Sequence, residues 1–205
     1  MKCLQSSATI RLHLIVVHLY LAFRPDVLIN QDAAVAAMEA CLCDIRQWMF
    51  RDRCVINDEK TEFAMIGTSA QPAKVHLSTH TVGEAEIVPT EGNIKNVGVL
   101  FDNTLSMSQN VNMICRSDYY HLRSIMRIRK YLNMDSVKKL THAFDTSRLD
   151  HCKGLLYGLP ACTIAKLQRL QNVAARTVMQ VPKLYYISPI LSSLHWLPVK
   201  YRIDL

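Results

Sequence analysis

The hydrophobic and polar positions of the first fifty residues predict one long amphipathic helix. Asn30 or Asp32 can cap its start, because each side chain has an oxygen that accepts a hydrogen bond from a free backbone N–H. The helix is expected to run to about Arg51. Apolar residues recur along it at intervals of three and four and form one stripe, made of Val35, Met38, Leu42, Ile45 and Met49.

Shorter apolar stretches on both sides of this helix predict strands. Before it, residues 12–23 are mostly apolar, and 18–23 have the aromatic and branched character of a buried strand. The alternative for this stretch is a signal-like N-terminus, because Lys2 and Arg11 precede it. It is shorter than the roughly 20 apolar residues of a membrane span, so no membrane association is expected. After the helix, strands are expected at 61–66, 73–77, 86–88 and 97–101.

The second half of the chain has the periodicity of helices. These are expected near 108–131, 135–147, 163–180 and 189–195, with Trp196 in the core beside the last of them. A mixed part over residues 1–104 is therefore followed by an all-helical part over residues 105–205. This organisation indicates the α+β fold class.

The helix expected at 108–131 carries cations on one side and apolar residues on the other. At about 100° per residue, the four cations fall within a sector of roughly 60°. The helix can bury one face and present a cationic ridge on the other, which is how phosphates are bound. The cations of the ridge are Arg116, Arg123, Arg127 and Lys130, and the opposite face has Val111, Ile114, Leu122, Ile125 and Ile128.

A basic face that is merely solvated is the alternative interpretation of this pattern. Two observations favour a nucleic-acid track instead. Residues 1–104 contain 9 Lys+Arg and 12 Asp+Glu, a balance of −3, whereas residues 105–205 contain 15 and 5, a balance of +10, which together give the net +7. The helices that follow add further cations to the predicted track, namely Lys138, Lys139, Lys166, Arg169 and Arg176.

Composition and cysteine usage indicate a globular intracellular protein of the nucleus or cytoplasm. Half of the residues are hydrophobic, and the seven cysteines include no Cys-x-x-Cys pair, so reduced and buried thiols are expected. A metal site is not expected, because no second cluster completes the ligand set that His142, His151 and Cys152 would begin. No cofactor is indicated.

Several sequence motifs, in order along the chain, are similar to one known family. They are Asn57–Phe63, Ser147–Cys152, Leu155–Pro160, Leu167–Asn172 and Leu194–Ile203. This set resembles the part of the reverse transcriptase of non-LTR retrotransposons that lies downstream of the catalytic core. The resemblance implies a transposable-element origin, with a truncated palm remnant (strands plus one helix) over 1–104 and a basic, thumb-like region over 105–205.

The residues that would carry polymerase chemistry are not present in this sequence. The family's RNA-directed DNA polymerase activity uses two metal ions held by carboxylates, two of which come from a Tyr-Ala-Asp-Asp turn. Ile15 and Val16 stand where those aspartates would align, and neither can bind Mg²⁺. The resemblance also implies a vestigial catalytic lysine at Lys60 and a primer-grip-like glycine at Gly98, which permits close backbone approach or an unusual dihedral angle.

These observations leave three hypotheses for function. The first is a catalytically inactive reverse-transcriptase fragment that retains non-specific binding to RNA or an RNA/DNA hybrid. The second is a decayed relic or gene-prediction product with no activity. The third is an accessory chain of an RNA-directed DNA polymerase, for which a partner would have to supply the whole palm.

Overall fold

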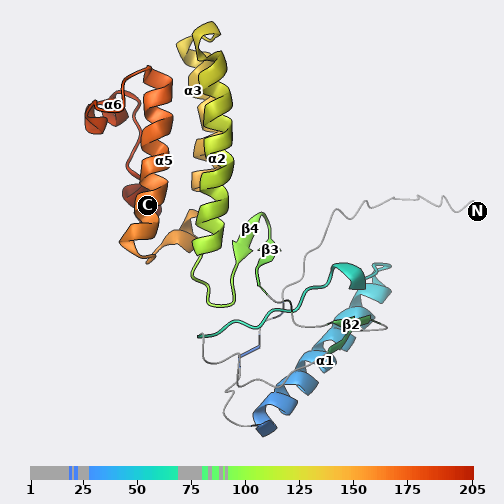
Figure 1. The fold of residues 1–205 in the computed structure, drawn as a ribbon. Helices are drawn as coiled ribbons and strands as arrows, with labels where there is room; N and C mark the ends of the chain where they lie inside the picture. The colour runs from blue at the N-terminus through green and yellow to red at the C-terminus, as the bar shows by residue number, and fades with distance from the viewer. Residues whose placement is uncertain are drawn as a thin grey trace, which may run out of the picture. The chain divides into compact units, whose positions relative to one another are not determined.

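The computed structural model describes residues 19, 21–22, 28–68, 80–82, 85–87, 90 and 92–205. The chain divides into two compact units, one made of residues 1–61 with 74–87 and the other of residues 62–73 with 88–205. The described residues are mostly helical and include two short antiparallel hairpins (Figure 1), so the predicted α+β class is confirmed.

The first unit contains the long predicted helix, α1 (Leu28–Arg51), which begins two residues before Asn30. Its predicted apolar stripe is confirmed, because Met49 is buried and the other four members are half-buried. The Arg46 guanidinium pairs with the carboxylate of Asp58, which opens the short 3-10 helix η1 (Asp58–Lys60). Trp48 and Phe50 remain exposed, at 54% and 81%, so this unit has little buried core among its described residues.

Each of the two hairpins has one strand that was predicted and one that was not. β1 (His80–Val82) pairs with β2 (Ala85–Ile87), and β3 (Ile94–Asn96) pairs with β4 (Val99–Phe101). β2 and β4 lie close to the predicted strands, but β1 and β3 were missed because three residues are too few to show alternation.

Of the other predicted strands, one is wrong and two lie wholly or partly outside the described residues. The strand predicted at 61–66 is wrong: the Phe63 carbonyl accepts a hydrogen bond from the Thr90 N–H, but the segment joins no ladder among the described residues. The strand predicted at 73–77 lies outside the described residues. So do three of the six residues 18–23, and the described residues 19, 21 and 22 are not in a strand.

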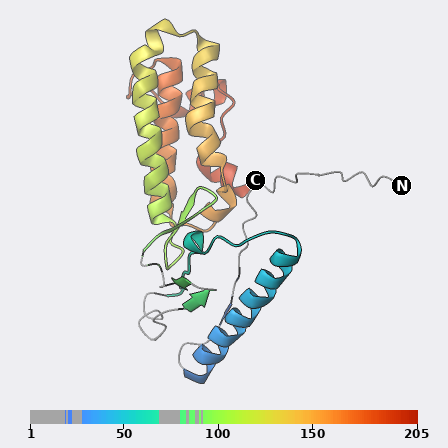
Figure 2. The same ribbon diagram turned by 90° about the vertical axis from the view of Figure 1, so that its right-hand side faces the viewer.

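The second unit is a bundle of helices. α2, α3 and α5 lie side by side, with α6 and α7 packed on α5 (Figures 1 and 2). Three helices, α2, α5 and α6, both begin and end close to their predicted limits, and α7 was missed because it is only six residues long. The helices are α2 (Ser108–Ile128), α3 (Met134–Thr141), α4 (Ser147–Asp150), α5 (Ala161–Met179), α6 (Ile187–Ser193) and α7 (Val199–Asp204).

The bundle has a continuous apolar core. Leu122 of α2 packs with Leu167 and Leu170 of α5, and all three side chains are fully buried. Trp196 packs against this cluster and against a second one around α6, as predicted for a core residue. The prediction for Ile128 is wrong, because it is the last residue of α2 and is 46% exposed. Burial of apolar surface contributes about 25 cal/mol of stability per Å², and in this bundle that contribution comes from the core.

The helix predicted at 135–147 is interrupted. A π-helical turn, η4 (His142–Thr146), separates α3 from α4. The Ser147 hydroxyl donates to the Ala143 carbonyl at 2.6 Å, and the turn buries the carboxyl group of Asp145. Single π-turns often mark functional or strained positions, and no apolar periodicity announces them.

Candidate nucleic-acid interface

α2 presents the predicted cations to solvent. Val111, Ile114, Leu122 and Ile125 are buried on one face of the helix, while Arg116, Arg123 and Arg127 are exposed on the opposite face. Because the buried face of α2 packs in an apolar core, the cations on the opposite face remain in solvent. The amphipathic arrangement predicted for this helix is therefore confirmed for these residues.

Two cations of α5 lie close to α2. The Lys166 ammonium donates to the Asn112 Oδ1 at 3.1 Å. Arg169 lies near Tyr119: burial raises the pKa of the Tyr119 phenol, and the charge of Arg169 acts against this rise.

Helical spacing places two arginines of α2 one turn from the residues that Lys166 and Arg169 approach. Asn112 is followed after four residues by Arg116, and Tyr119 after four residues by Arg123, so each member of a pair lies one turn from the other on one side of α2. We call the resulting surface the α2/α5 flank, defined by Arg116, Arg123, Lys166 and Arg169.

The other predicted cations have different surroundings. Lys130 lies past the end of α2, where its ammonium is 4.8 Å from the centre of the Tyr131 ring. Lys138 and Lys139 are exposed on α3 and are not part of the α2/α5 flank. Arg176 is half-buried and donates to the Tyr185 carbonyl at 3.3 Å, so part of its hydrogen-bonding capacity is used within the protein.

Acidic residues are kept away from this flank. Residues 103–117, 119–134 and 151–203 contain no Asp or Glu, so Asp118 is the one acid within α2, and α2 packs against the acid-free α5. Of the five acids in residues 105–205, Asp118 and Asp145 are buried and Asp150 pairs with Arg202. The surface charge is therefore more positive than the formal balance of +10 suggests.

The two buried acids lie on the buried side of α2, towards α4 and η4. Burial raises the pKa of Asp118 to about 7, against the opposing effect of the Arg148 guanidinium. Burial and then the charge of Asp118 raise the pKa of Asp145 to about 7. Neither carboxyl oxygen of Asp145 has a hydrogen-bond partner within the protein, so the neutral form is favoured there. Each of these acids therefore carries much less than a full charge at neutral pH.

Two arginines that sequence reasoning did not single out are structural. Arg148 donates to the Ser117 hydroxyl and lies 3.5 Å from the Asp118 carboxylate. Arg129 donates to the carbonyls of Thr177, Val178 and Leu132 at 3.3, 2.8 and 2.9 Å. The signal for both was available, because at 100° per residue Arg129 and Asp118 fall on the apolar side of α2 and so need polar partners.

The motifs that carry the family resemblance meet in the bundle. The Gln168 Oε1 accepts from the Val199 N–H at 2.8 Å, and the Gln171 Nε2 donates to the Leu197 carbonyl at 2.8 Å. The Arg202 Nε donates to the Asp150 Oδ1 at 3.0 Å. In this structure, these motif residues tie α4, α5 and the segment around α7 together.

Gly98 has the unusual dihedral angle that was predicted. With Val97 it forms the two-residue turn of the β3–β4 hairpin, with φ values of +84° and +46°. The His151 Nε2 lies 2.9 Å from the Val97 carbonyl and would be 3.6 Å from a Cβ at Gly98. Lys60 is exposed at the end of η1, where its backbone N–H donates to the Asn57 Oδ1.

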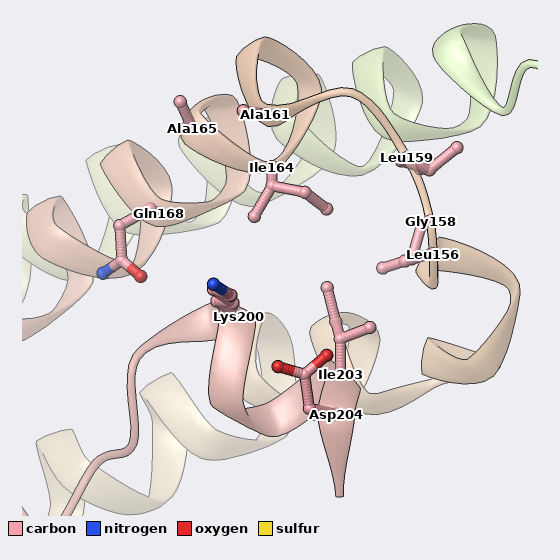
Figure 3. A pocket seen from close by; sticks show the side chains of 10 residues that line it. All are labelled: Leu156, Gly158, Leu159, Ala161, Ile164, Ala165, Gln168, Lys200, Ile203 and Asp204. Carbon is pink, nitrogen blue, oxygen red and sulfur yellow. The ribbon is translucent and has the colours of Figure 1, made fainter.

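A hollow of about 400 Å³ lies between the start of α5 and α7 (Figure 3). Its wall is largely apolar, and the amide of Gln168 is already engaged with Gln171, Asn172 and Val199. Lys200 and Asp204 are the charged residues in its lining, so it offers few groups for chemistry. It is lined by Leu156, Gly158, Leu159, Ala161, Ile164, Ala165, Gln168, Lys200, Ile203 and Asp204.

The cysteines correct one prediction. The six in the described residues are free, as expected, but none is buried: Cys54 and Cys115 are half-buried and the others exposed. Burial raises the pKa of the Cys115 thiol, with the charge of Asp118 adding to the effect and that of Lys166 opposing it. In the described part of the chain, no three His, Cys, Asp or Glu side chains gather as metal ligands. Its helices also lack the combination of length and hydrophobicity that a membrane span requires.

Comparisons with protein-family models, curated proteins and solved structures find no match to this chain.

Proposed function

We propose that residues 105–205 bind RNA or an RNA/DNA hybrid through its phosphates, in a catalytically inactive fragment that derives from a non-LTR retrotransposon reverse transcriptase. In this proposal residues 1–104 are the palm remnant and the helical bundle is the thumb-like region. The family origin is supported by the motif residues quoted above, and Ile15 and Val16 lie outside the described residues.

One observation carries the binding proposal. α5 has no acid and the one acid of α2, Asp118, is buried, as is Asp145 of η4, while four exposed cations from the two packed helices define the α2/α5 flank. Counterion release by phosphates favours binding to such a surface, with little preference for base sequence.

The test compares two variants with equal charge. One changes Arg116, Arg123, Lys166 and Arg169 to Gln. The control changes Lys138, Lys139, Lys153 and Lys200, which are away from the flank, to Gln. We expect the flank variant to lose about 100-fold in affinity for RNA at low salt, and the control to lose much less, because only phosphates close to cations release their counterions. Circular dichroism and thermal unfolding check that both variants remain folded.

Equal losses in the two variants would show that net charge alone attracts RNA, and no loss would show that the flank is only a solvated surface. The inactive part of the proposal is tested separately. The purified chain should extend no primer on an RNA template with Mg²⁺ or Mn²⁺, since Ile15 and Val16 stand where the two metal-binding aspartates would align. Template-dependent incorporation above a no-protein control would refute it.

A further inference from the structure

A turn after α5 holds three large apolar side chains in solvent. Leu184, Tyr185 and Tyr186 are consecutive, and they are 96%, 61% and 87% exposed. Soluble proteins rarely expose such a group without a partner for it, although single exposed apolar residues are common.

The backbone of this turn is anchored to α5 and does not hang free. The Val181 N–H donates to the Arg176 carbonyl at 3.3 Å, and the Tyr185 N–H donates to the Pro182 carbonyl at 3.1 Å. The Arg176 guanidinium then donates to the Tyr185 carbonyl at 3.3 Å. Because these contacts fix the backbone, little backbone conformational entropy would be lost when the tyrosines bind a ligand.

A third exposed tyrosine lies at the same end of the bundle. Tyr131 is 77% exposed and follows α2 in the 3-10 turn η3 (Arg129–Tyr131). The contacts of Arg129 with the Thr177 and Val178 carbonyls place η3 beside the last turn of α5, from which the tyrosine turn begins. Figures 1 and 2 show these ends of α2 and α5 next to each other.

The surroundings of these tyrosines are mainly cationic, and Asp135 in the first turn of α3 is the acid closest to Tyr131 in the sequence. Lys130 lies over the Tyr131 ring, and Lys183 and Arg176 flank the turn. Both segments belong to the acid-free stretches 119–134 and 151–203. Aromatic rings among cations fit unpaired bases, which stack on the rings while their phosphates meet the cations. Paired bases are already stacked within a duplex and cannot use such rings.

We infer that Tyr131, Tyr185 and Tyr186 form a stacking platform for a single-stranded stretch of RNA or DNA at the end of the α2/α5 flank. This inference rests on the proposed function and deepens it, since it specifies where a strand leaves the phosphate contacts and how its bases are held. The platform adds affinity for single strands and none for a blunt duplex.

The experiment uses the full chain and three probes: a single-stranded RNA of about 12 nucleotides, the same strand with abasic sites in its centre, and a blunt RNA/DNA hybrid. Tyr185→Ala and Tyr186→Ala should each weaken binding of the normal strand about tenfold. Tyr185→Phe and Tyr186→Phe should restore it, because the ring remains. The abasic strand and the hybrid should be insensitive to all four substitutions.

Tyr157→Ala is the matched control, because Tyr157 is 72% exposed but lies before α5, at the opposite end of the bundle. An equal loss in this control, or no loss in the platform variants, would overturn the inference. If wild-type protein binds all three probes equally and with the same salt dependence, the platform fails and the proposed function stands. If it binds none of them at low salt, both fail. Binding of the normal strand that survives loss of the tyrosines would leave this surface as a site for a protein partner and refute the stacking role.

Discussion

The two flanks of α2 differ in the sign and the burial of their charged side chains. On the flank towards α5, Arg116 and Arg123 are exposed one helical turn from Asn112 and Tyr119, which Lys166 and Arg169 approach. On the flank towards α4 and η4, Asp118 and Asp145 are buried beside the single cation Arg148. Positive charge is thus left in water, where it can meet a partner, while negative charge is buried and partly neutralised by protonation, since burial raises the pKa of both acids to about 7. For binding an anionic partner, the position of each charge therefore matters more than the net charge of the chain.

The largest expected effect breaks the buried side of this comparison. The raised pKa of Asp145 means that the folded protein holds a proton which the unfolded chain releases above about pH 4, so stability falls as pH rises from about 4 to about 7. Asp145→Asn removes the ionisable group and should stabilise the fold at pH 8 by at most about 4 kcal/mol, since about three pKa units are involved. At pH 4 the variant and the wild type should be nearly equally stable.

Urea unfolding at several pH values measures this difference. The substitution is preferable to Asp118→Asn, because Asp118 faces Arg148 and its loss would leave a cation without its acidic partner. A stability difference that does not change between pH 4 and pH 8, or a variant that is less stable at pH 8, would contradict a buried and protonated Asp145.

A smaller effect separates two arginines on the two flanks. Arg148→Gln should cost about 2 kcal/mol at pH 8, because Asp118 loses its cation, although the 41% exposure of the Arg148 side chain keeps the loss below that of a fully buried pair. Arg123→Gln should change stability by less than about 0.5 kcal/mol, since its side chain is exposed on α2. Chemical denaturation measures both. The flank assignment is wrong if Arg123→Gln proves as destabilising as Arg148→Gln.

Much of the helical unit could be predicted from its sequence, and the reasons are physical. The buried face of α2 has a regular spacing that one window reveals, so its limits and its exposed arginines were found. The ties between Gln168 and Val199 or between Asp150 and Arg202 join residues more than 30 positions apart, which local periodicity cannot show. The buried pair Asp118 and Asp145 was missed for the same reason, and the π-turn that buries Asp145 has no local signal.

The first unit shows the limits of the same reasoning. Its long helix was found from one stripe, but the strand predicted at 61–66, which lies almost wholly in the second unit, needed a neighbouring strand that the sequence does not specify. The strands of its described hairpin are three residues long, and such pairing depends on the turn more than on alternation. For the candidate interface, composition located the positive half of the chain. Only the structure separated the cations on the α2/α5 flank from Arg129 and Arg148, which bind the protein's own carbonyls and acids.

The salt dependence of RNA binding tests the central claim most directly. The affinity of the wild-type chain for single-stranded RNA should fall linearly with the logarithm of salt concentration, at about −0.7 per phosphate contact, which amounts to roughly −3 for four contacts. Changing the four cations of the α2/α5 flank to Gln should flatten the slope by about this amount while the protein remains folded. A folded quadruple variant whose slope equals that of the wild type would contradict the claim that this flank binds phosphates.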